Sequence, residues 1–309
     1  MRVYRTLDEI QTTGPTVLTI GTFDGLHRGH RALLSQLTAA ASRLKAQSAV
    51  LAFHPRPKTV LAPHLFTNDY LTTPEERIKL FESCGLDILA LVPFSLELAQ
   101  TPADVFVQTL VERLHPVEFW CGHDFALGKN REGNVTRLAE LGRKWGYTVR
   151  EFAPVYLDGT VISSTQVRQA LQAGDVRRAA ELLGRYPSVS GVVVGGDGRG
   201  RKLGIPTANL APPPERLLPA NGVYATYARL AGEPERLAGV TNVGVRPSFD
   251  GDTRTVEIYL FDFDRDIYGQ QMTVEFVARL RDEQKFESVD ALIAQIQADI
   301  QQARQILGA

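Results

Sequence analysis

Two histidines three residues apart, His27 and His30, lie in the glycine-rich stretch G-T-F-D-G-L-H-R-G-H at residues 21–30. At the start of a helix, residues at this spacing point the same way, so both imidazoles could donate hydrogen bonds to phosphate oxygens. The three glycines of the stretch let the backbone turn tightly and approach a ligand closely. The chemistry this predicts is phosphate binding. The alternative is a polar turn whose histidines decorate the surface.

A second group of polar residues opens another helix far along the chain. Ser163, Ser164 and Thr165 are followed by Arg168, and apolar residues recur at helical spacing from Val167 onward. A helix N-terminus combined with an arginine makes an anion clamp. Hydroxyl side chains at a helix start commonly serve only as caps, and this alternative stays open. Two such helix starts facing each other would hold a triphosphate from both sides.

A third group combines a basic glycine-rich loop with a lone glutamate. The loop, G-G-D-G-R-G-R-K-L-G-I-P-T-A-N at residues 195–209, does not match a Walker A motif and on its own is typical of a solvated surface turn. Glu257 lies between Val256 and Ile258 inside an apolar run. It is either a catalytic carboxylate or the partner of an arginine or lysine on a neighbouring strand.

Strand and helix signals alternate through the first half of the chain. The expected strands cover residues 17–20, 49–53, 87–92, 117–121 and 147–152, with helical patterns between them. This alternation predicts a doubly wound, mostly parallel sheet that binds ligands beyond the carboxyl ends of its strands. The glycine-rich stretch follows the first of these strands. His54 follows the second and either faces a ligand or fills a loop, and the segment from His54 to Pro57 is expected to leave regular structure.

The alternation of strand and helix patterns stops after Gly184. Strand patterns at 188–194, 222–230, 237–243, 255–261 and 272–280 follow one another with little helix between them, which predicts an antiparallel barrel. A closing helix begins near Ser288 and carries Leu292, Ile296 and Ile300 on one face. We therefore expect two domains, residues 1–184 and 187–309.

Composition limits the possible partners. The chain of 309 residues has a formal net charge of −1, which argues against a main role on nucleic acid. No signal-peptide core and no apolar run of membrane-spanning length is present, so we expect a cytoplasmic protein. Cys84 and Cys121 are expected to be reduced structural thiols, and zinc binding by Cys121 and His123 is not expected because no second cluster completes a site.

These motifs together resemble known enzymes. H-x-G-H and I-S-S-T-x-x-R resemble the two signatures of the nucleotidylyltransferase superfamily, and the longer form G-x-F-D-G-x-H-x-G-H resembles its flavin adenylyltransferase branch. R-G-R-x-L-G-x-P-T-A-N and the strand around Glu257 resemble riboflavin kinases. Nearly the whole chain resembles the prokaryotic bifunctional riboflavin kinase/FAD synthetase family.

The resemblance implies two reactions and a role for each motif residue. The C-terminal domain would phosphorylate riboflavin with MgATP to give FMN, and the Rossmann-like N-terminal domain would transfer AMP from a second ATP to FMN, giving FAD and pyrophosphate. Flavins would thus be substrates and products, not redox cofactors. The implied catalytic residues are Glu257, His27 and His30.

The resemblance also implies which residues bind the substrates. The implied nucleotide-binding residues are Gly21, Phe23, Asp24, Gly29, Ser163, Ser164, Thr165, Arg168, Gly198, Arg199, Gly200, Arg201, Gly204 and Pro206. The implied flavin-binding residues are His54, Asp124, Arg281, Glu283 and Phe286. The implied Mg²⁺ ligands are Thr207 and Asn209.

The sequence departs from the family pattern at one position, and two other functions remain possible. Leu127 occupies a position where the family usually has an aromatic residue, which would weaken FMN binding if that ring holds the flavin. The chain could instead be a nucleotidylyltransferase for another substrate, with the barrel as a regulatory module. It could also be a flavin-binding or nucleic-acid-binding regulator without chemistry. A monomer or a weak homo-oligomer is expected.

Overall fold

The computed structural model describes residues 1–64, 69–196, 200, 203–248 and 251–309, with side chains left out at 246–253. Contacts divide the chain into two compact units, Met1–Ser164 and Thr165–Ala309. This division falls twenty residues before Gly184, where the sequence changes from alternating strand and helix patterns to successive strand patterns. Each unit is described below by itself.

The first unit is built on a six-stranded, entirely parallel sheet with strand order β1-β4-β3-β2-β5-β8. Its strands are β1 (Arg2–Tyr4), β2 (Thr16–Gly21), β3 (Gln47–Phe53), β4 (Ile88–Val92), β5 (Pro116–Gly122) and β8 (Thr148–Phe152). The chain leaves β2 towards β3 and β4 and later returns to the other side of β2 as β5. The carboxyl end of β2 is therefore the point where the strand order reverses, the usual ligand site of such sheets.

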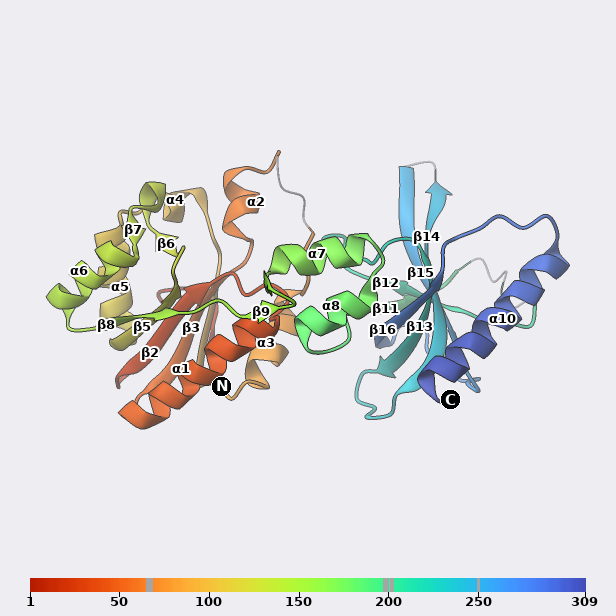
Figure 1. Ribbon diagram of the computed structural model, residues 1–309, viewed down its shortest axis with the longest axis horizontal. Helices are drawn as coiled ribbons and strands as arrows, with labels where there is room; N and C mark the ends of the chain where they lie inside the picture. Colours follow the sequence, from red (N-terminus) through yellow and green to blue (C-terminus); the bar gives the residue numbers. More distant parts are fainter. Residues whose placement is uncertain (65–68, 197–199, 201–202, 249–250) are drawn as a thin grey trace. The chain divides into compact units, whose positions relative to one another are not determined.

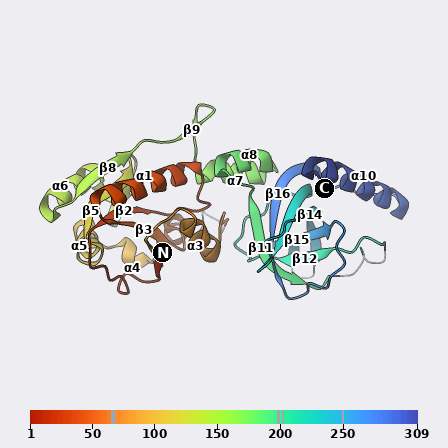
Figure 2. The same cartoon turned by 90° about the horizontal axis from the view of Figure 1, so that it is seen from below.

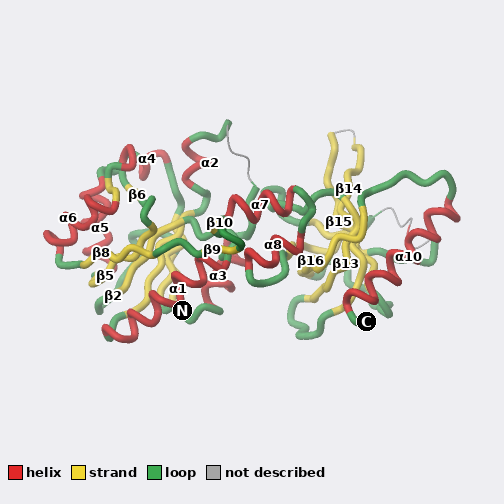
Figure 3. Tube along the Cα trace, viewed as in Figure 1, coloured by secondary structure: helices red, strands yellow, loops and turns green. Residues whose placement is uncertain are grey.

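Helices cover both faces of this sheet, as Figure 3 shows in red against the yellow strands. The helices of the unit are α1 (Arg28–Leu44), α2 (Pro57–Leu61), α3 (Pro74–Glu82), α4 (Leu96–Ala99), α5 (Ala103–Leu114) and α6 (Val135–Trp145). Successive side chains of β2 point to opposite faces of the sheet, and each face packs against one layer of helices. Val17 packs in the core beneath α1 and α3, whereas Leu18 packs in the core beneath α5 and α6. The predicted doubly wound fold is confirmed.

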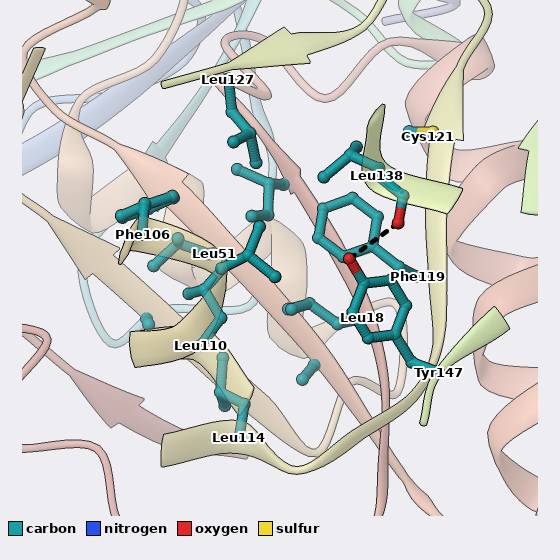
Figure 4. Packing of buried hydrophobic residues seen from close by; sticks show 14 of the residues in the cluster. Leu18, Leu51, Phe106, Leu110, Leu114, Phe119, Cys121, Leu127, Leu138 and Tyr147 are labelled. Carbon is teal, nitrogen blue, oxygen red and sulfur yellow. Dashed lines mark hydrogen bonds between the residues drawn. The ribbon is translucent and has the colours of Figure 1, made fainter. Parts of the chain in front are cut away.

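The core beneath α5 and α6 explains two of the residues singled out in the sequence (Figure 4). Leu127 belongs to this core and is only 9% exposed, so its side chain is used for packing. Cys121 is a free, buried thiol of the same core, and burial, aided by Glu151, raises its pKa to about 11. A thiol that stays protonated is a poor nucleophile, which agrees with a structural role. The Tyr147 hydroxyl closes this core by donating to the Leu138 carbonyl at 2.9 Å.

The second unit is a closed barrel in the order β11-β12-β15-β14-β13-β16, in which every pairing described is antiparallel (Figure 1). Its elements are α7 (Ser164–Gln172, with Ser164 in the first unit), α8 (Val176–Leu183), β11 (Ser188–Val194), β12 (Ala208–Ala211), β13 (Gly222–Leu230), β14 (Leu237–Ser248), β15 (Gly251–Leu260), β16 (Gln271–Arg281) and α10 (Val289–Leu307). The predicted barrel and closing helix are confirmed. The sixth strand, β12, was missed because only four residues of it stand between Pro206 and Pro212.

Helix α10 packs on the outside of the barrel against β13, β14 and β16 (Figure 2). Ile300, Ala303 and Leu307 of the helix form a cluster with Val223 and Val240 of the barrel wall. Alternate residues of the strands point the other way. Val256 and Ile258 of β15 are fully buried, whereas Glu257 between them is half-buried and faces the side of α10. The strand period of two thus places Glu257 on the outer face of the wall.

Several short elements of the first unit were not predicted. His54, Pro55 and Arg56 lie outside regular structure as expected, whereas Pro57 begins α2 at its first position. Proline suits this position because its missing N–H is not needed there. The further pieces are β6 (Ala126–Leu127), η1 (Lys129–Arg131), β7 (Gly133–Asn134), β9 (Tyr156–Leu157) and β10 (Thr160–Val161).

Candidate active sites

The glycine-rich stretch forms the turn from β2 into α1, as predicted. His27 is the N-cap of α1, and its Nδ1 accepts a hydrogen bond from the backbone N–H of His30 at 3.3 Å. A ring nitrogen that accepts carries no proton, so Nε2 is the N–H donor of a neutral His27. The His27 and His30 rings stack with centroids 3.6 Å apart and planes 17° apart. The two imidazoles therefore act as one unit at the positive end of the α1 dipole.

Glycines and an aromatic ring shape this turn. A Cβ on Gly21 would lie 3.0 Å from the Phe23 ring, and a Cβ on Gly29 would lie 3.2 Å from the His27 ring. Phe23 is buried, and its ring centroid lies 4.9 Å from that of His30. Gly21, Phe23 and Gly29 thus hold the histidine pair in place.

Burial lowers the pKa of His30 well below its ordinary value of 6.5, and His27 and Arg77 lower it further. Its Nδ1 is buried without a hydrogen-bond partner among the described residues. A neutral His30 places no second positive charge against the His27 ring and keeps one N–H for a ligand.

The lowered pKa of His30 predicts a pH-dependent stability. Below about pH 6.5 the unfolded chain takes up a proton that the folded chain refuses, so the free energy of unfolding should fall as the pH drops through this range. The contribution of His30 to this slope should reach at most about 1.4 kcal/mol per pH unit. Urea unfolding between about pH 7.5 and about pH 5 measures it. His30→Gln should flatten the slope, and equal slopes in variant and wild type would contradict the assignment.

Asp24 is the centre of a buried network and is only 2% exposed. Its carboxylate accepts hydrogen bonds from the Leu71 N–H, the Thr72 N–H and the Thr72 hydroxyl at 3.0–3.1 Å. Arg56 and Arg77 pair with it at 3.8 and 3.9 Å. Asp24 therefore ties the first turn to the segment that precedes α3.

Removal of the Asp24 carboxylate should destabilise the first unit strongly. In Asp24→Ala the fully buried Arg77 loses its ion-pair partner, and three N–H or O–H donors lose their acceptor. This should lower the free energy of unfolding by about 3–5 kcal/mol. Urea denaturation of the variant measures this loss. The matched control is Asp8→Ala, because Asp8 is 91% exposed and pairs with Arg113 at the surface; we expect a change of less than about 1 kcal/mol. Equal effects of the two substitutions would contradict the network.

Ser164, the first residue of α7, donates its hydroxyl to the Asp24 carbonyl oxygen at 2.8 Å. Ser163 immediately precedes it, and the Ile162 carbonyl oxygen lies 3.6 Å from where a Cβ on Gly29 would be. The start of the second motif thus lies against the first motif, although some 140 residues separate them. Thr165 and Arg168 continue α7 in the second unit.

His54 and Asp124 lie at the same edge of the sheet as the glycine-rich turn. They follow β3 and β5, the two neighbours of β2, and parallel strands end at a common edge. The His54 ring lies 4.9 Å from the Tyr70 ring, whereas Asp124 is exposed in the turn after β5. This edge therefore presents the histidine pair, His54 and Asp124 from three adjacent strands.

The second unit holds a cavity of about 350 Å³ between the barrel wall and α10. It collects residues from segments that are far apart in the sequence. The predicted residues in its lining are Gly200, Thr207, Glu257, Arg281, Glu283 and Phe286. Apolar side chains of β13, β14 and α10, among them Val223, Val240 and Ile296, form the opposite surface. Convergent polar groups in a mostly apolar cavity are typical of a small-molecule site.

Glu257 has asparagines on both neighbouring strands. It pairs in register with Asn209 of β12 and with Asn242 of β14. Glu257 makes no ion pair with any residue that the structure describes. The expectation of a basic cross-strand partner is therefore not supported, and the carboxylate remains available to a ligand.

Two glycines leave room around the expected Mg²⁺ ligands. A Cβ on Gly200 would lie 3.3 Å from the Thr207 hydroxyl, and a Cβ on Gly196 would lie 2.2 Å from the Asn209 amide nitrogen. The hydroxyl oxygen of Thr207 and the amide oxygen of Asn209 are donors that a hard cation accepts. The residues present fit a magnesium ion.

A second cavity, of about 360 Å³, lies on the other side of Thr207. Pro206 and Thr207 line it together with Ile258, Phe263 and Tyr268. Thr207 is thus common to the walls of both cavities. Gly204, with φ +73°, completes the turn in which the Gly200 carbonyl accepts from the N–H groups of residues 203 and 205. The predicted nucleotide-binding residues Gly198, Arg199 and Arg201 lie outside the described residues.

Sequence reasoning missed three charged residues that the structure places at these sites. Arg56 and Arg77 pair with Asp24. Asp299 of α10 pairs with Arg281 and lines the cavity between the barrel wall and α10. Arg77 and Asp299 did leave a signal, because each is a charged residue on the apolar face of its helix. Arg77 shares a face with Phe81, and Asp299 with Ile296 and Ala303.

Family models match both halves of the chain. The model described as FAD synthetase matches residues 9–166, and the model described as riboflavin kinase matches residues 183–307. Between them they cover both candidate sites, with His27 and His30 in the first and Glu257 in the second.

Whole-chain relatives carry both activities in their names. The bifunctional riboflavin kinase/FMN adenylyltransferase of Haemophilus influenzae is 37% identical, covering 93% of this chain and 92% of the relative. The protein of the same name from Escherichia coli K12 is 38% identical, and the match covers 94% of this chain and 93% of the relative. The one from Listeria monocytogenes is 34% identical, and the match covers 93% of this chain and 91% of the relative.

A solved structure extends over the same length. It is entitled a macrolide-efflux protein from Streptococcus pneumoniae, with a TM-score of 0.88, 32% identity and 98% of each chain covered. In the described part of this chain, every helix is too short or too polar to span a membrane. From the two domain matches and the whole-length relatives, the chain belongs to the bifunctional riboflavin kinase/FMN adenylyltransferase family and carries both catalytic domains.

Proposed function

We propose that this chain makes FAD from riboflavin in two steps, with the residues described above in specific roles. The observation that carries the proposal is the cavity in which Glu257, Thr207 and Phe286 converge from distant segments. The first step would phosphorylate riboflavin with MgATP in the barrel. The second would transfer AMP from another ATP to FMN at the sheet edge formed by β3, β2 and β5.

In the kinase step, Glu257 accepts the proton of the riboflavin 5′-hydroxyl as this oxygen attacks the γ-phosphorus of ATP. The bond from the γ-phosphorus to the bridging oxygen breaks, and ADP leaves. Phe286 packs on the isoalloxazine ring, with Arg281 and Glu283 beside it. Apolar side chains of the second cavity, Phe263 and Tyr268 among them, suit the adenosine of ATP, so the γ-phosphate would reach the flavin cavity past Thr207.

A magnesium ion bound together with ATP would neutralise charge that develops on the transferred phosphoryl group. Thr207 and Asn209 would supply oxygen ligands for it, since Asn209 pairs in register with Glu257 and Thr207 lines the same cavity as Glu257. Glycines leave room around both ligands. The glycine-rich loop that includes Gly198, Gly200 and Gly204, with Arg199, Arg201 and Pro206, would close over the phosphates.

In the adenylylation step, a phosphate oxygen of FMN attacks the α-phosphorus of ATP, and pyrophosphate leaves. The N–H groups of His27 and His30 donate to oxygens whose negative charge increases in the transition state. Ser163, Ser164, Thr165 and Arg168 hold the β- and γ-phosphates. His54 and Asp124 contact the flavin, and Asp24 holds the turn in place.

The remaining assignments follow from the same proposal. Domain boundaries at 184 and 187 are supported by Gly184, which ends α8 with φ +71°, and by β11, which begins at Ser188. Free Cys84 and Cys121 suit the reducing cytoplasm. ATP, riboflavin, FMN and FAD are the expected partners, without nucleic acid or membrane, in a monomer or weak homo-oligomer.

The test is a time course. Purified full-length protein is incubated with riboflavin and MgATP, and the flavins are separated chromatographically. FMN should appear first and FAD after it, and chelation of the divalent cation with EDTA should stop both. FMN that accumulates without FAD would remove the second activity and show that the first unit does not adenylylate FMN. No flavin turnover at all would overturn the proposal in favour of a flavin-binding regulator.

A further inference from the structure

Helix α10 contributes one carboxylate to the flavin cavity, and this carboxylate is nearly fully buried. Asp299 is 2% exposed and lines the cavity. Its Oδ1 and Oδ2 accept from Nε of Arg281 at 3.0 and 3.1 Å, and Oδ2 also accepts from Nη2 of Arg281 at 2.8 Å. Gln295, one turn earlier on α10, donates to Oδ1 at 2.9 Å. The carboxylate is thus fixed by four contacts from two side chains.

Arg281 connects this carboxylate to the segment that follows β16. Its third nitrogen, Nη1, donates to the Asp282 carbonyl at 2.9 Å. Its guanidinium carbon lies 5.7 Å from the centroid of the Phe286 ring, within the range of a cation–π contact. All three nitrogens of Arg281 therefore have acceptors in the protein, and its face supports the aromatic ring.

Packing alone does not explain the acidic residue. Asp299 shares its face of α10 with Ile296, Ile300 and Ala303, which pack against the barrel. An apolar side chain there would bury as well, and replacement of buried ion pairs by apolar residues is often neutral or stabilising. The pair is better explained by the geometry that it imposes on its neighbours.

We propose that Asp299 is a positioning residue for the flavin substrate. By holding the Arg281 guanidinium it orients Phe286, the aromatic wall of the cavity, and so fixes where the isoalloxazine ring lies relative to Glu257. With its charge neutralised by Asp299, Arg281 offers the cavity a flat donor surface without net charge. This surface suits an uncharged flavin ring and not a phosphate. The inference rests on the proposed kinase function.

The first test is Asp299→Asn, which keeps the shape of the side chain and removes its charge. The KM for riboflavin should rise by at least about tenfold, because small misplacements of a substrate are costly, while kcat and the KM for ATP stay within about twofold. Quenching of riboflavin fluorescence on binding should show a matching rise in Kd. The matched control is Asp262→Asn, which breaks the other ion pair of α10, with Arg304, away from the cavity. It should change none of these constants.

The second test separates geometry from stability. Arg281→Met combined with Asp299→Leu replaces the ion pair by apolar side chains, so the variant should unfold at a urea concentration close to that of wild type. The KM for riboflavin should nevertheless rise by at least about tenfold. A wild-type KM in this stable double variant would overturn the inference, as would an unchanged KM in Asp299→Asn.

The outcomes distinguish the inference from the function on which it rests. If wild-type protein neither binds nor phosphorylates riboflavin, the proposed function fails and the inference fails with it. If wild type is active and both variants bind riboflavin as wild type does, the inference alone fails. A fall in kcat with an unchanged KM would also overturn it, since that pattern indicates a role in the chemical step.

Discussion

Glu257→Gln is expected to lower kcat for riboflavin phosphorylation by about 10²- to 10⁴-fold, the usual contribution of a general base. Glutamine has the size of glutamate and can still accept a hydrogen bond, but it cannot take the proton of the 5′-hydroxyl. The cross-strand neighbours Asn209 and Asn242 are uncharged, so no buried cation loses its partner. Stability should therefore stay close to that of wild type.

Two measurements make this prediction specific. FMN supplied directly should be converted to FAD at the wild-type rate, because the histidine pair lies in the other unit. The matched control is Glu275→Gln on β16, another half-buried glutamate of the barrel, which pairs with Arg236 and is absent from the lining of both cavities. It should phosphorylate riboflavin normally. If Glu257→Gln and Glu275→Gln lose riboflavin phosphorylation to the same extent, the loss reflects damage to the barrel and not the removal of a general base.

His30→Ala should stop the reaction at FMN. Loss of one donor to a developing negative charge typically costs about 10²- to 10³-fold in kcat, so FAD formation should become hard to detect while FMN accumulates. His30 is the better choice of the two histidines because His27 also caps α1, and its loss would disturb the helix start.

The control for this variant is His115→Asn. His115 is exposed and precedes β5, at the edge of the sheet opposite to the histidine pair, and asparagine tolerates its left-handed backbone conformation. FAD formation by this variant should equal that of wild type. Continued conversion of FMN to FAD by His30→Ala at more than about a tenth of the wild-type rate would remove His30 from the transition-state contacts.

The parts of the fold that local sequence determines could be predicted. The turn from β2 to α1 was expected from its glycines and from the apolar spacing on either side. The alternation of strands and helices also sufficed for the doubly wound sheet. These features depend on residues within a few positions of one another.

Features that depend on long-range pairing could not be predicted. Strand β12 is held by its two neighbours, β11 and β15, and its four residues are too few for a periodic signal. Asn209 was therefore expected in a loop, whereas it lies on this strand opposite Glu257. Leu127 was noted because it replaces an aromatic residue usual in the family, whose loss would weaken FMN binding if that ring holds the flavin. That the Leu127 side chain packs in the core beneath α5 and α6 could be seen only in the structure.

The alternation of side chains along β15 limits how the length of this strand can change in evolution. Glu257 faces the cavity only because Val256 and Ile258 face the interior, and β15 is hydrogen-bonded on both sides, to β12 and β14. A one-residue insertion or deletion within the strand would turn the carboxylate into the apolar interior and expose its neighbours. Length changes among descendants should therefore accumulate in the connections between strands, and β15 itself should keep its length even where its other side chains drift.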